Sequence, residues 1–271
     1  MKKTIGFIGT GNMGGAIIKG IVNKKTAEPQ CIVAYDKNTD ALKRLGAELG
    51  IRAAENLQEV CKADILFLAV KPNVIYSVID EIKNYIDYAD TVIVSIAAGQ
   101  SIERLTKAFE CDTIRLIRVM PNTPTLVGEG MTAVSLNNIM QSEQNRENAN
   151  YIISLFESLG KAEAVPESLM DTVTGVSGSS PAYIFMLIEA MADAAVLGGM
   201  PRNQAYTFAA QSVLGSAKMV LESGKHPAEL KDMVCSPSGT TIEAVKVLEN
   251  EGFRGTVIDE IDACIKKSAS M

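Results

Sequence analysis

The sequence predicts an α/β protein in which a Rossmann-like, mostly parallel sheet is followed by an all-helical domain. Short apolar segments alternate with helical segments over the first 165 residues, which is typical of a parallel sheet with helices on both faces. A glycine-rich loop follows the first of these apolar segments. Beyond residue 166 only helical patterns remain, so we divide the chain into two domains, 1–165 and 166–271.

The spacing of apolar residues predicts each element in turn. Strands are predicted at residues 4–9, 31–35, 65–70, 91–96, 114–119 and 131–135. The helices between them are predicted at residues 12–23, 40–49, 73–86 and 101–109, the last with Ser101 as its N-cap. Helices of the second domain are predicted at residues 181–197, 202–223, 228–234, 240–250 and 253–267. Residues 175–224 are rich in Gly, Ala and Ser, which suits close packing between helices.

Composition narrows the class of protein. The 271 residues are 47% hydrophobic and 21% charged, as expected of a folded globular chain rather than a disordered one. The formal net charge is -6 and no Lys/Arg-rich run occurs, which argues against nucleic acid as a partner. We find no signal peptide, and the longest unbroken apolar run, residues 65–70, is about a third of a membrane span. These features predict a cytoplasmic protein without a membrane partner.

Cysteine and histidine usage predicts neither a disulfide framework nor a metal site. The five cysteines are widely spread, their number is odd, and no C-x-x-C occurs. The chain has one histidine, His226, which leaves few options for metal ligation. Reduced thiols in a cytosolic protein are the simplest interpretation.

The glycine-rich loop predicts a dinucleotide site. Residues 9–14, GTGNMG, match G-x-G-x-x-G between a predicted strand and a predicted helix. Gly9 permits the tight turn, Gly11 lets the backbone approach a pyrophosphate, and Gly14 lets the helix lie close to the sheet. The helix N-terminus adds N–H donors and partial positive charge.

Asp36 bears on the choice of cofactor. It ends the second predicted strand, 22 residues beyond Gly14, where an acidic side chain accepts hydrogen bonds from the adenosine ribose. A carboxylate there favours NADH, whereas the adjacent Lys37 and Asn38 could accept the 2′-phosphate of NADPH, so both cofactors stay open. Two further loops, residues 69–72 and 97–99, follow predicted strands and have small side chains that leave room for a ribose and a nicotinamide ring.

Two polar segments interrupt the helical half, at residues 175–183 and 234–242. Pro181 suits the first turn of a helix after Ser180, and Ser238 or Thr240 could cap the helix that follows the second segment. Exposed N–H groups and hydroxyls at a helix N-terminus bind carboxylates well. The segments therefore predict either a small-anion pocket or two ordinary capped helix starts.

At these residues the chain resembles the pyrroline-5-carboxylate reductase family. The resemblance covers nearly the whole length, through GFIGTGNMGGAI, FLAVKP, SIAAG, RVMPNTP, GVSGSSPAY, HPAELKDMVCSPSGTTIEAVKVLE and GFRG. It implies reduction of the cyclic imine 1-pyrroline-5-carboxylate to L-proline by NADPH or NADH, the last step of proline synthesis. It also implies a dinucleotide-binding domain followed by a helical dimerisation and substrate domain. The partner is then a second copy of the chain, in a homodimer or a larger homo-oligomer such as a ring of dimers, with the active site at the dimer interface.

The resemblance also implies roles for individual residues. The residues implied for the cofactor are Gly9, Gly11, Asn12, Met13, Gly14, Asp36, Lys37, Asn56, Ala69, Val70, Lys71 and Ala97. The residues implied for the substrate are Ser177, Pro181, Ser236, Gly239, Thr240 and Thr241, with Thr241 near the ring nitrogen as the one catalytic assignment. The family commonly has Gly where this chain has Ser180 and Ser238, so both positions add a side chain near the implied pocket.

The residue inventory agrees with imine reduction and bears on two alternatives. An imine can arrive already protonated, so hydride attack needs orientation more than acid catalysis, and His226 before Pro227 suits a capping or surface role. A β-hydroxyacid dehydrogenase would carry a catalytic Lys on the first long helix of the second domain, but no Lys lies between Ala162 and Ala217. A regulatory protein that only senses the dinucleotide would have lost the substrate loop, whereas residues 236–241 are intact.

Overall fold

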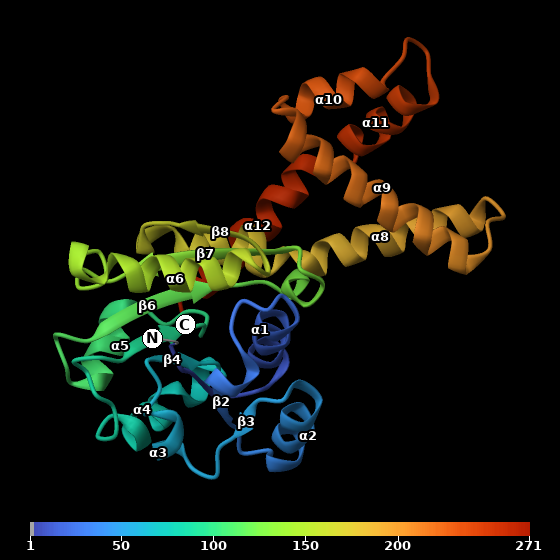
Figure 1. Ribbon diagram of the computed structural model, residues 1–271. Helices are drawn as coiled ribbons and strands as arrows, with labels where there is room; N and C mark the ends of the chain where they lie inside the picture. The colour runs from blue at the N-terminus through green and yellow to red at the C-terminus, as the bar shows by residue number, and fades with distance from the viewer. Residues whose placement is uncertain (1–2) are drawn as a thin grey trace. The chain divides into compact units, whose positions relative to one another are not determined.

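A computed structural model describes residues 3–271, and these residues form two compact units (Figure 1). The first unit contains the chain up to Ser179 together with Cys264–Met271, and the second contains Ser180–Ala263. This division falls later than residue 165, because the helical turns after the last strand stay attached to the sheet. Asn122, for example, donates a hydrogen bond from Nδ2 to the carbonyl oxygen of Ser177 at 3.1 Å.

One eight-stranded sheet forms the centre of the first unit, in the order β3-β2-β1-β4-β5-β6-β7-β8. The strands are β1 (Ile5–Ile8), β2 (Ile32–Tyr35), β3 (Arg52–Ala53), β4 (Ile65–Leu68), β5 (Val92–Ser95), β6 (Arg115–Met120), β7 (Gly130–Leu136) and β8 (Gly160–Ala164). All pairings from β3 to β6 are parallel, β7 is antiparallel to β6, and β8 is parallel to β7. The order 3-2-1-4-5-6 is that of the Rossmann fold, so the predicted fold class is confirmed.

The helices of this unit include the four that were predicted and three that were not, at residues 57–60, 146–157 and 170–173. They are α1 (Asn12–Asn23), α2 (Thr39–Leu49), α3 (Leu57–Val60), α4 (Ile75–Ile82), α5 (Ile102–Phe109), α6 (Arg146–Glu157) and α7 (Met170–Val173). The helix predicted at 73–86 is shorter than expected, because Pro72–Val74 forms a separate 3-10 turn before it. Ser101 caps α5 as predicted, since its side chain accepts a hydrogen bond from the Arg104 N–H.

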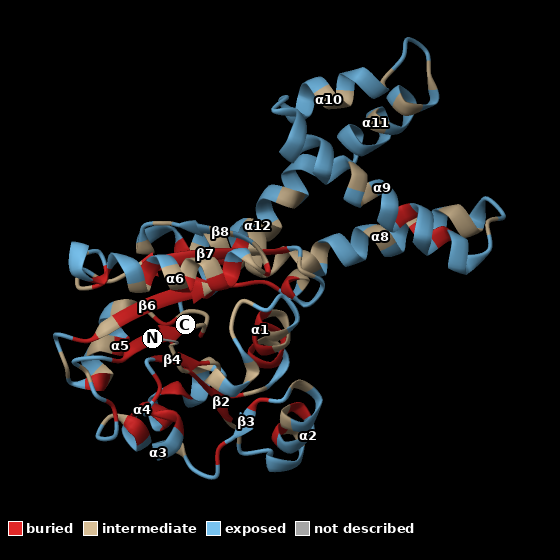
Figure 2. Ribbon diagram, in the orientation of Figure 1, coloured by how far each residue is buried: buried red, intermediate tan, exposed pale blue. Residues whose placement is uncertain are grey.

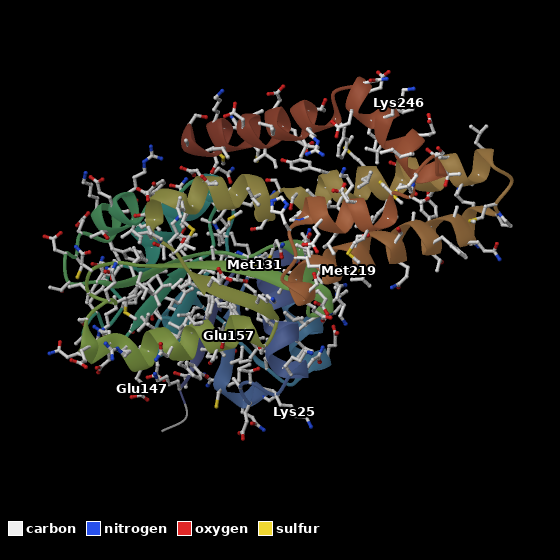
Figure 3. The ribbon with its side chains drawn as sticks, turned by 90° about the horizontal axis from the view of Figure 1, so that it is seen from above. Lys25, Met131, Glu147, Glu157, Met219 and Lys246 are labelled. Carbon is white, nitrogen blue, oxygen red and sulfur yellow. The ribbon has the colours of Figure 1, made fainter. Side chains whose placement is uncertain are left out.

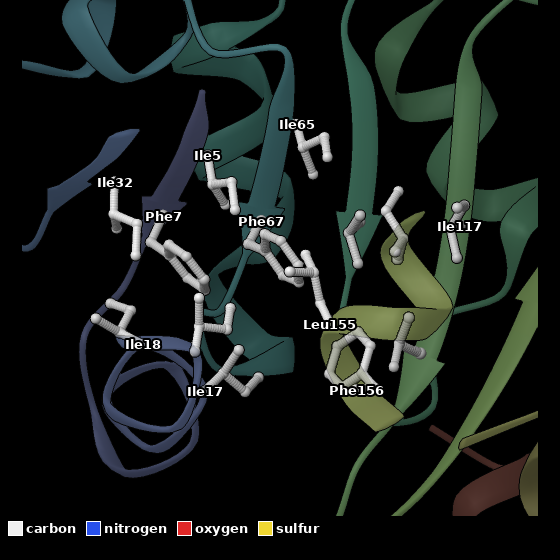
Figure 4. Packing of buried hydrophobic residues seen from close by; sticks show 14 of the residues in the cluster. Ile5, Phe7, Ile17, Ile18, Ile32, Ile65, Phe67, Ile117, Leu155 and Phe156 are labelled. Carbon is white, nitrogen blue, oxygen red and sulfur yellow. The ribbon is translucent and has the colours of Figure 1, made fainter. Parts of the chain in front are cut away.

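Alternating strand residues send their side chains to opposite faces of the sheet. Phe7 and Phe67 stack at 4.5 Å between ring centroids and face α1 and α6, which contribute Ile17 and Phe156 (Figure 4). On the other face, residues such as Leu66 contact the helices α3, α4 and α5. The outer side of α6 is charged and carries Glu147 and Glu157 (Figure 3). Both faces of the sheet are thus covered, as its continuous apolar strands predict.

The second unit contains α8 (Ser180–Leu197), α9 (Arg202–Ser223), α10 (Pro227–Val234), α11 (Thr240–Asn250) and the first part of α12 (Phe253–Ala269). Helices α8 and α9 pack through small buried side chains, Ala192, Ala205 and Ala209. The rest of this unit is largely exposed (Figure 2), including large apolar side chains such as Phe185 at 62% and Phe208 at 65%. Such an apolar surface on a single chain indicates that another protein surface covers it.

Within residues 3–271, one helical run is long and apolar enough to cross a membrane by length and composition, Glu167–Leu197. It begins with a 3-10 turn (Glu167–Leu169) and continues through α7, a π-helical turn (Thr174–Gly178) and α8. Its apolar residues include exposed positions of α8, such as Phe185 and Met186. A surface buried between protein subunits has the same composition, so the run is weak evidence for a membrane span.

The cysteines are free thiols, as predicted. Cys61 is buried beside β4 and α4, and its burial raises the pKa of the thiol to about 12. This thiol is therefore protonated at neutral pH and serves as an apolar core residue.

Candidate functional site

The glycine loop lies between β1 and α1, where β2 and β4 flank β1 on either side. Gly9 has a φ of +100° and donates its N–H to the Tyr35 carbonyl at 2.8 Å, and a Cβ on it would lie 2.5 Å from the Ala69 carbonyl oxygen. A Cβ on Gly14 would lie 2.3 Å from the Gly9 carbonyl oxygen. Both positions therefore require glycine for the backbone to close on itself.

Gly11 differs from its two neighbours in the motif. A Cβ there would meet nothing within 4 Å, and its φ of −61° suits any residue. Gly11 is the N-cap of α1, no side chain caps it, and the first turn of the helix holds no acidic residue. The open backbone and the uncapped helix N-terminus together form a cradle that fits an anionic pyrophosphate.

Asp36 is hydrogen-bonded to the glycine loop. Its Oδ2 accepts hydrogen bonds from the Thr10 N–H at 2.6 Å and the Thr10 hydroxyl at 3.0 Å, and its Oδ1 accepts from the Asn38 N–H at 2.8 Å. The side chain of Asn38 in turn caps α2 by accepting from the Ala41 N–H at 3.1 Å. Sequence reasoning missed both roles, although Thr and Asn at these loop positions are typical of such bonds.

A cavity of about 300 Å³ lies at the carboxyl ends of β1, β2 and β4. Its lining includes seven of the residues implied for the cofactor: Gly9, Gly11, Asp36, Lys37, Ala69, Val70 and Lys71. A neighbouring pocket of about 600 Å³ is lined by Asn56 and shares Tyr35, Leu57 and Glu81 with the first. Those three shared residues were not predicted, and the position of Tyr35 directly before Asp36 was the available signal. Asn12 and Met13 lie in the first turn of α1, and Ala97 is buried just after β5.

The predicted substrate loop joins α10 to α11 in the second unit. It forms a turn in which the Gly239 N–H donates to the Ser236 carbonyl at 3.1 Å, and a Cβ on Gly239 would lie 2.3 Å from Ser236 Oγ. The expectation that Ser238 or Thr240 caps α11 is wrong. Gly239 is the N-cap, without a side-chain cap bond, because Ser238 has a left-handed φ of +57° and Thr240 already lies in the helix. The N–H groups of Thr240 and Thr241 thus open the helix.

The segment around Ser177 is helical rather than an interruption. Ser177 lies in the π-helical turn Thr174–Gly178, where its hydroxyl donates to the Val173 carbonyl at 3.2 Å. Pro181 is the second residue of α8, in the first turn as predicted. π-Turns within α-helices are frequent at functional sites. His226 caps α10 through Nδ1, which accepts from the Ala228 N–H at 3.2 Å, and this confirms the capping role.

We predict that Ser238→Gly stabilises the protein by about 0.5–1 kcal/mol, because glycine removes the cost of the left-handed backbone, partly offset by its greater unfolded-state entropy. Denaturant unfolding measures this change. The matched control is Ser216→Gly inside α9, which should destabilise the helix. A loss of stability in both variants would contradict the prediction.

Comparison with known proteins decides the family. The chain is 52% identical over 272 residues to the pyrroline-5-carboxylate reductase of Escherichia coli K12, across 100% of this chain and 99% of the relative. The chain belongs to the pyrroline-5-carboxylate reductase family. A pyrroline-5-carboxylate reductase of Methanosarcina acetivorans is 44% identical across 98% of this chain and 97% of its own length.

Solved structures and family descriptions agree with this membership. A Plasmodium falciparum pyrroline carboxylate reductase with NADP bound has a TM-score of 0.87 at 31% identity, across 99% of this chain and 97% of that one. The Coxiella burnetii pyrroline-5-carboxylate reductase has a TM-score of 0.89 at 30% identity, across 100% and 98%. Residues 4–99 match "NADP oxidoreductase coenzyme F420-dependent", and residues 167–271 match "Pyrroline-5-carboxylate reductase dimerisation". The chain is an NAD(P)H-dependent oxidoreductase whose second half supports self-association, as predicted.

Proposed function

We propose that this chain carries out the reaction of its family, in which a hydride from NADPH or NADH reduces 1-pyrroline-5-carboxylate to L-proline. This reaction is the last step of proline biosynthesis. The observation that carries the proposal is the relationship at 52% identity over the full length, since it spans both the cofactor loop and the 236–241 loop. The β-hydroxyacid dehydrogenase alternative has no such support.

We assign cofactor binding to the cradle and to the loops around it. The open face of Gly11 and the uncapped N-terminus of α1 suit the pyrophosphate. The residues assigned to the cofactor are Gly9, Gly11, Asn12, Met13, Gly14, Asp36, Lys37, Asn56, Ala69, Val70, Lys71 and Ala97. The adenosine end lies in this proposal near Asp36 and Asn56, and the nicotinamide end near Lys71 and Ala97.

We assign substrate binding to the start of α11 and the π-turn. The residues assigned to the substrate are Ser177, Pro181, Ser236, Gly239, Thr240 and Thr241. The N–H groups and hydroxyls at the start of α11 suit the carboxylate of the substrate. The Thr241 hydroxyl orients the ring nitrogen, where the developing amine needs a hydrogen-bond partner. A protonated imine needs no strong acid, which agrees with the capping role of His226.

The partner in this proposal is a second copy of the chain, in a homodimer that assembles further into a ring of dimers. The exposed apolar residues of α8 and α9, such as Phe185, Phe208 and Met219, suit burial in such an interface, and Figure 3 labels Met219. We further propose a cytoplasmic enzyme without nucleic-acid or membrane partners, in keeping with its net charge of -6. Sedimentation velocity tests the assembly, and a monomer at micromolar concentration would overturn it.

A turnover assay tests the reaction. Purified protein is mixed with 1-pyrroline-5-carboxylate and NADPH or NADH, and cofactor oxidation and proline formation are both measured. Stoichiometric formation of proline supports the proposal. Folded protein that binds the cofactor but forms no proline would overturn it in favour of a dinucleotide-sensing protein.

We predict that Asp36→Ser raises the ratio of kcat/KM with NADPH to kcat/KM with NADH by roughly tenfold. Removing the Asp36 carboxylate relieves its repulsion of a 2′-phosphate bound nearby, and a tenfold change in the ratio corresponds to about 1.4 kcal/mol. The matched control is Thr10→Val, which removes the hydroxyl that bonds Asp36 but changes no charge, and should leave the ratio unchanged. An equal shift of the ratio in both variants would mean that the hydrogen bonds between Asp36 and Thr10, rather than the charge of Asp36, set the cofactor preference.

A further inference from the structure

An ionic cluster around a buried arginine lies beside the loop that follows β5. Arg118 on β6 is 6% exposed, and its Nη1 lies 3.1 Å from Glu167 Oε1 while its Nη2 lies 3.9 Å from Asp171 Oδ1. Asp171 Oδ1 also accepts a hydrogen bond from the Ser268 hydroxyl at 2.6 Å. We call these four residues the Arg118 network. One strand, two helical turns and the end of α12 meet in it.

The network reaches the loop by two routes. The first is Glu167 Oε1, which accepts a hydrogen bond from the Ile102 N–H at 2.6 Å, at the first residue of α5. The second is the last turn of α12, where Ser268 is 4% exposed. Gly99 lies close to this end of the chain, since a Cβ on it would lie 3.5 Å from the Ser268 carbonyl oxygen and 2.7 Å from Cβ of Met271, two residues beyond α12. The segment 97–102 therefore packs against the end of the chain at Gly99 and is hydrogen-bonded to the network at Ile102.

A second hydrogen bond reaches the same segment, from α4. Gln100 is 5% exposed, and its Oε1 accepts a hydrogen bond from the Tyr76 hydroxyl at 2.5 Å. Tyr76 belongs to α4, which follows the loop 69–72. Gln100, which follows the 97–99 loop, is thus bonded to the first turn of α4, and Ile102, two positions further on, is bonded to the Arg118 network.

Pairing a buried guanidinium with two carboxylates contributes little net stability, because the cost of desolvation offsets most of the electrostatic attraction. Such a cluster does fix geometry, since charge-assisted hydrogen bonds are short and directional. Here one such bond, from the Ile102 N–H to Glu167, lies three residues after Gly99, which has a left-handed φ of +70°. A loop of this kind has several accessible conformations, so its position depends on what holds it.

We propose that the Arg118 network is a set of positioning residues that hold the 97–99 loop where the nicotinamide ring docks, and that the last turn of α12 is part of it. This inference rests on the proposed function for the location of the nicotinamide. The network does not touch the adenosine end of the site, which lies around Asp36. Loosening it therefore weakens binding of the nicotinamide end and spares binding of the other end.

The test compares two ligands on the full-length protein. NADPH contains the nicotinamide, whereas ADP-ribose 2′-phosphate lacks it. For Ser268→Ala and for Glu167→Gln, we expect the Kd of NADPH to rise about fivefold or more, while the Kd of the fragment stays within about twofold. The matched controls are Ser270→Ala, at the same helix end, and Glu103→Gln, an exposed ion-pair partner on α5. Both controls should leave both dissociation constants unchanged.

Two results would overturn the inference: an unchanged Kd of NADPH in Ser268→Ala, or an equal weakening of both ligands, which is the signature of general structural damage. Thermal melting identifies a Glu167→Gln protein that fails to fold, and Ser268→Ala, which removes one hydroxyl, then decides alone. Both readouts are binding constants, so wild-type protein that binds NADPH but forms no proline would refute the proposed function and leave this test standing.

Discussion

Gly11→Ala is expected to weaken NADPH and NADH binding by about 100-fold while leaving the thermal stability of the protein unchanged. The backbone tolerates alanine there, because φ is −61° and the new methyl group would meet no protein atom within 4 Å. The same open space is the place where a pyrophosphate approaches the N-terminus of α1. A methyl group in that space keeps the phosphates away from the N–H donors, and the loss of about 2.7 kcal/mol corresponds to 100-fold.

Fluorescence titration of the cofactor and thermal melting measure the two expectations. The matched control is Gly46→Ala in α2 of the same unit, where a Cβ would be in ordinary contact at 3.4 Å and should slightly stabilise the helix. Gly14→Ala should instead destabilise the protein, because its methyl group would lie 2.3 Å from a backbone oxygen. Tight cofactor binding by a folded Gly11→Ala protein would place the pyrophosphate elsewhere.

The fold could be predicted from the sequence because its signals are local. Apolar strands such as Ile65–Leu68 are buried on both faces, so their composition identifies them without knowledge of their neighbours. The helices α1, α9 and α11 begin and end where periodicity indicates. By contrast, β3 consists of Arg52 and Ala53, both exposed, and two residues carry no periodicity.

The parts of the site that could not be predicted depend on contacts between distant residues. Asp36 accepts hydrogen bonds from Thr10, which lies 26 positions earlier in the sequence, and Arg118 pairs with Glu167, which lies 49 positions later. The motif spacing predicts Asp36 as a ribose ligand but not as a partner of Thr10, and nothing in the local sequence distinguishes Arg118 and Glu167 from solvated residues. The predicted N-cap of α11 was wrong for a different reason. The left-handed backbone of Ser238 moves the N-cap position to the next residue, Gly239. The side-chain type alone does not reveal that shift.

Thr241→Ala is expected to lower kcat/KM for 1-pyrroline-5-carboxylate roughly 10- to 100-fold while cofactor binding persists. The half-buried hydroxyl of Thr241 lies in the first turn of α11, beside the N–H groups assigned to the substrate carboxylate. Removing one hydrogen bond to a charged group costs about 1.5–3 kcal/mol, which gives this range. If the hydroxyl acts on the developing amine, the loss falls mainly on kcat, because the bond strengthens in the transition state.

Two further variants separate this role from simple packing. Thr241→Ser keeps the hydroxyl and should recover most of the activity. Thr256→Ala, at an exposed threonine of α12 whose hydroxyl donates to the Gly252 carbonyl, should leave the kinetics unchanged. Equal losses in Thr241→Ala and Thr241→Ser would indicate that the methyl group matters and the hydroxyl does not. Unchanged kinetics in Thr241→Ala would remove this residue from the site. The start of α11 would then bind the carboxylate through its N–H groups alone, and the cofactor and the pocket shape would be left to orient the imine.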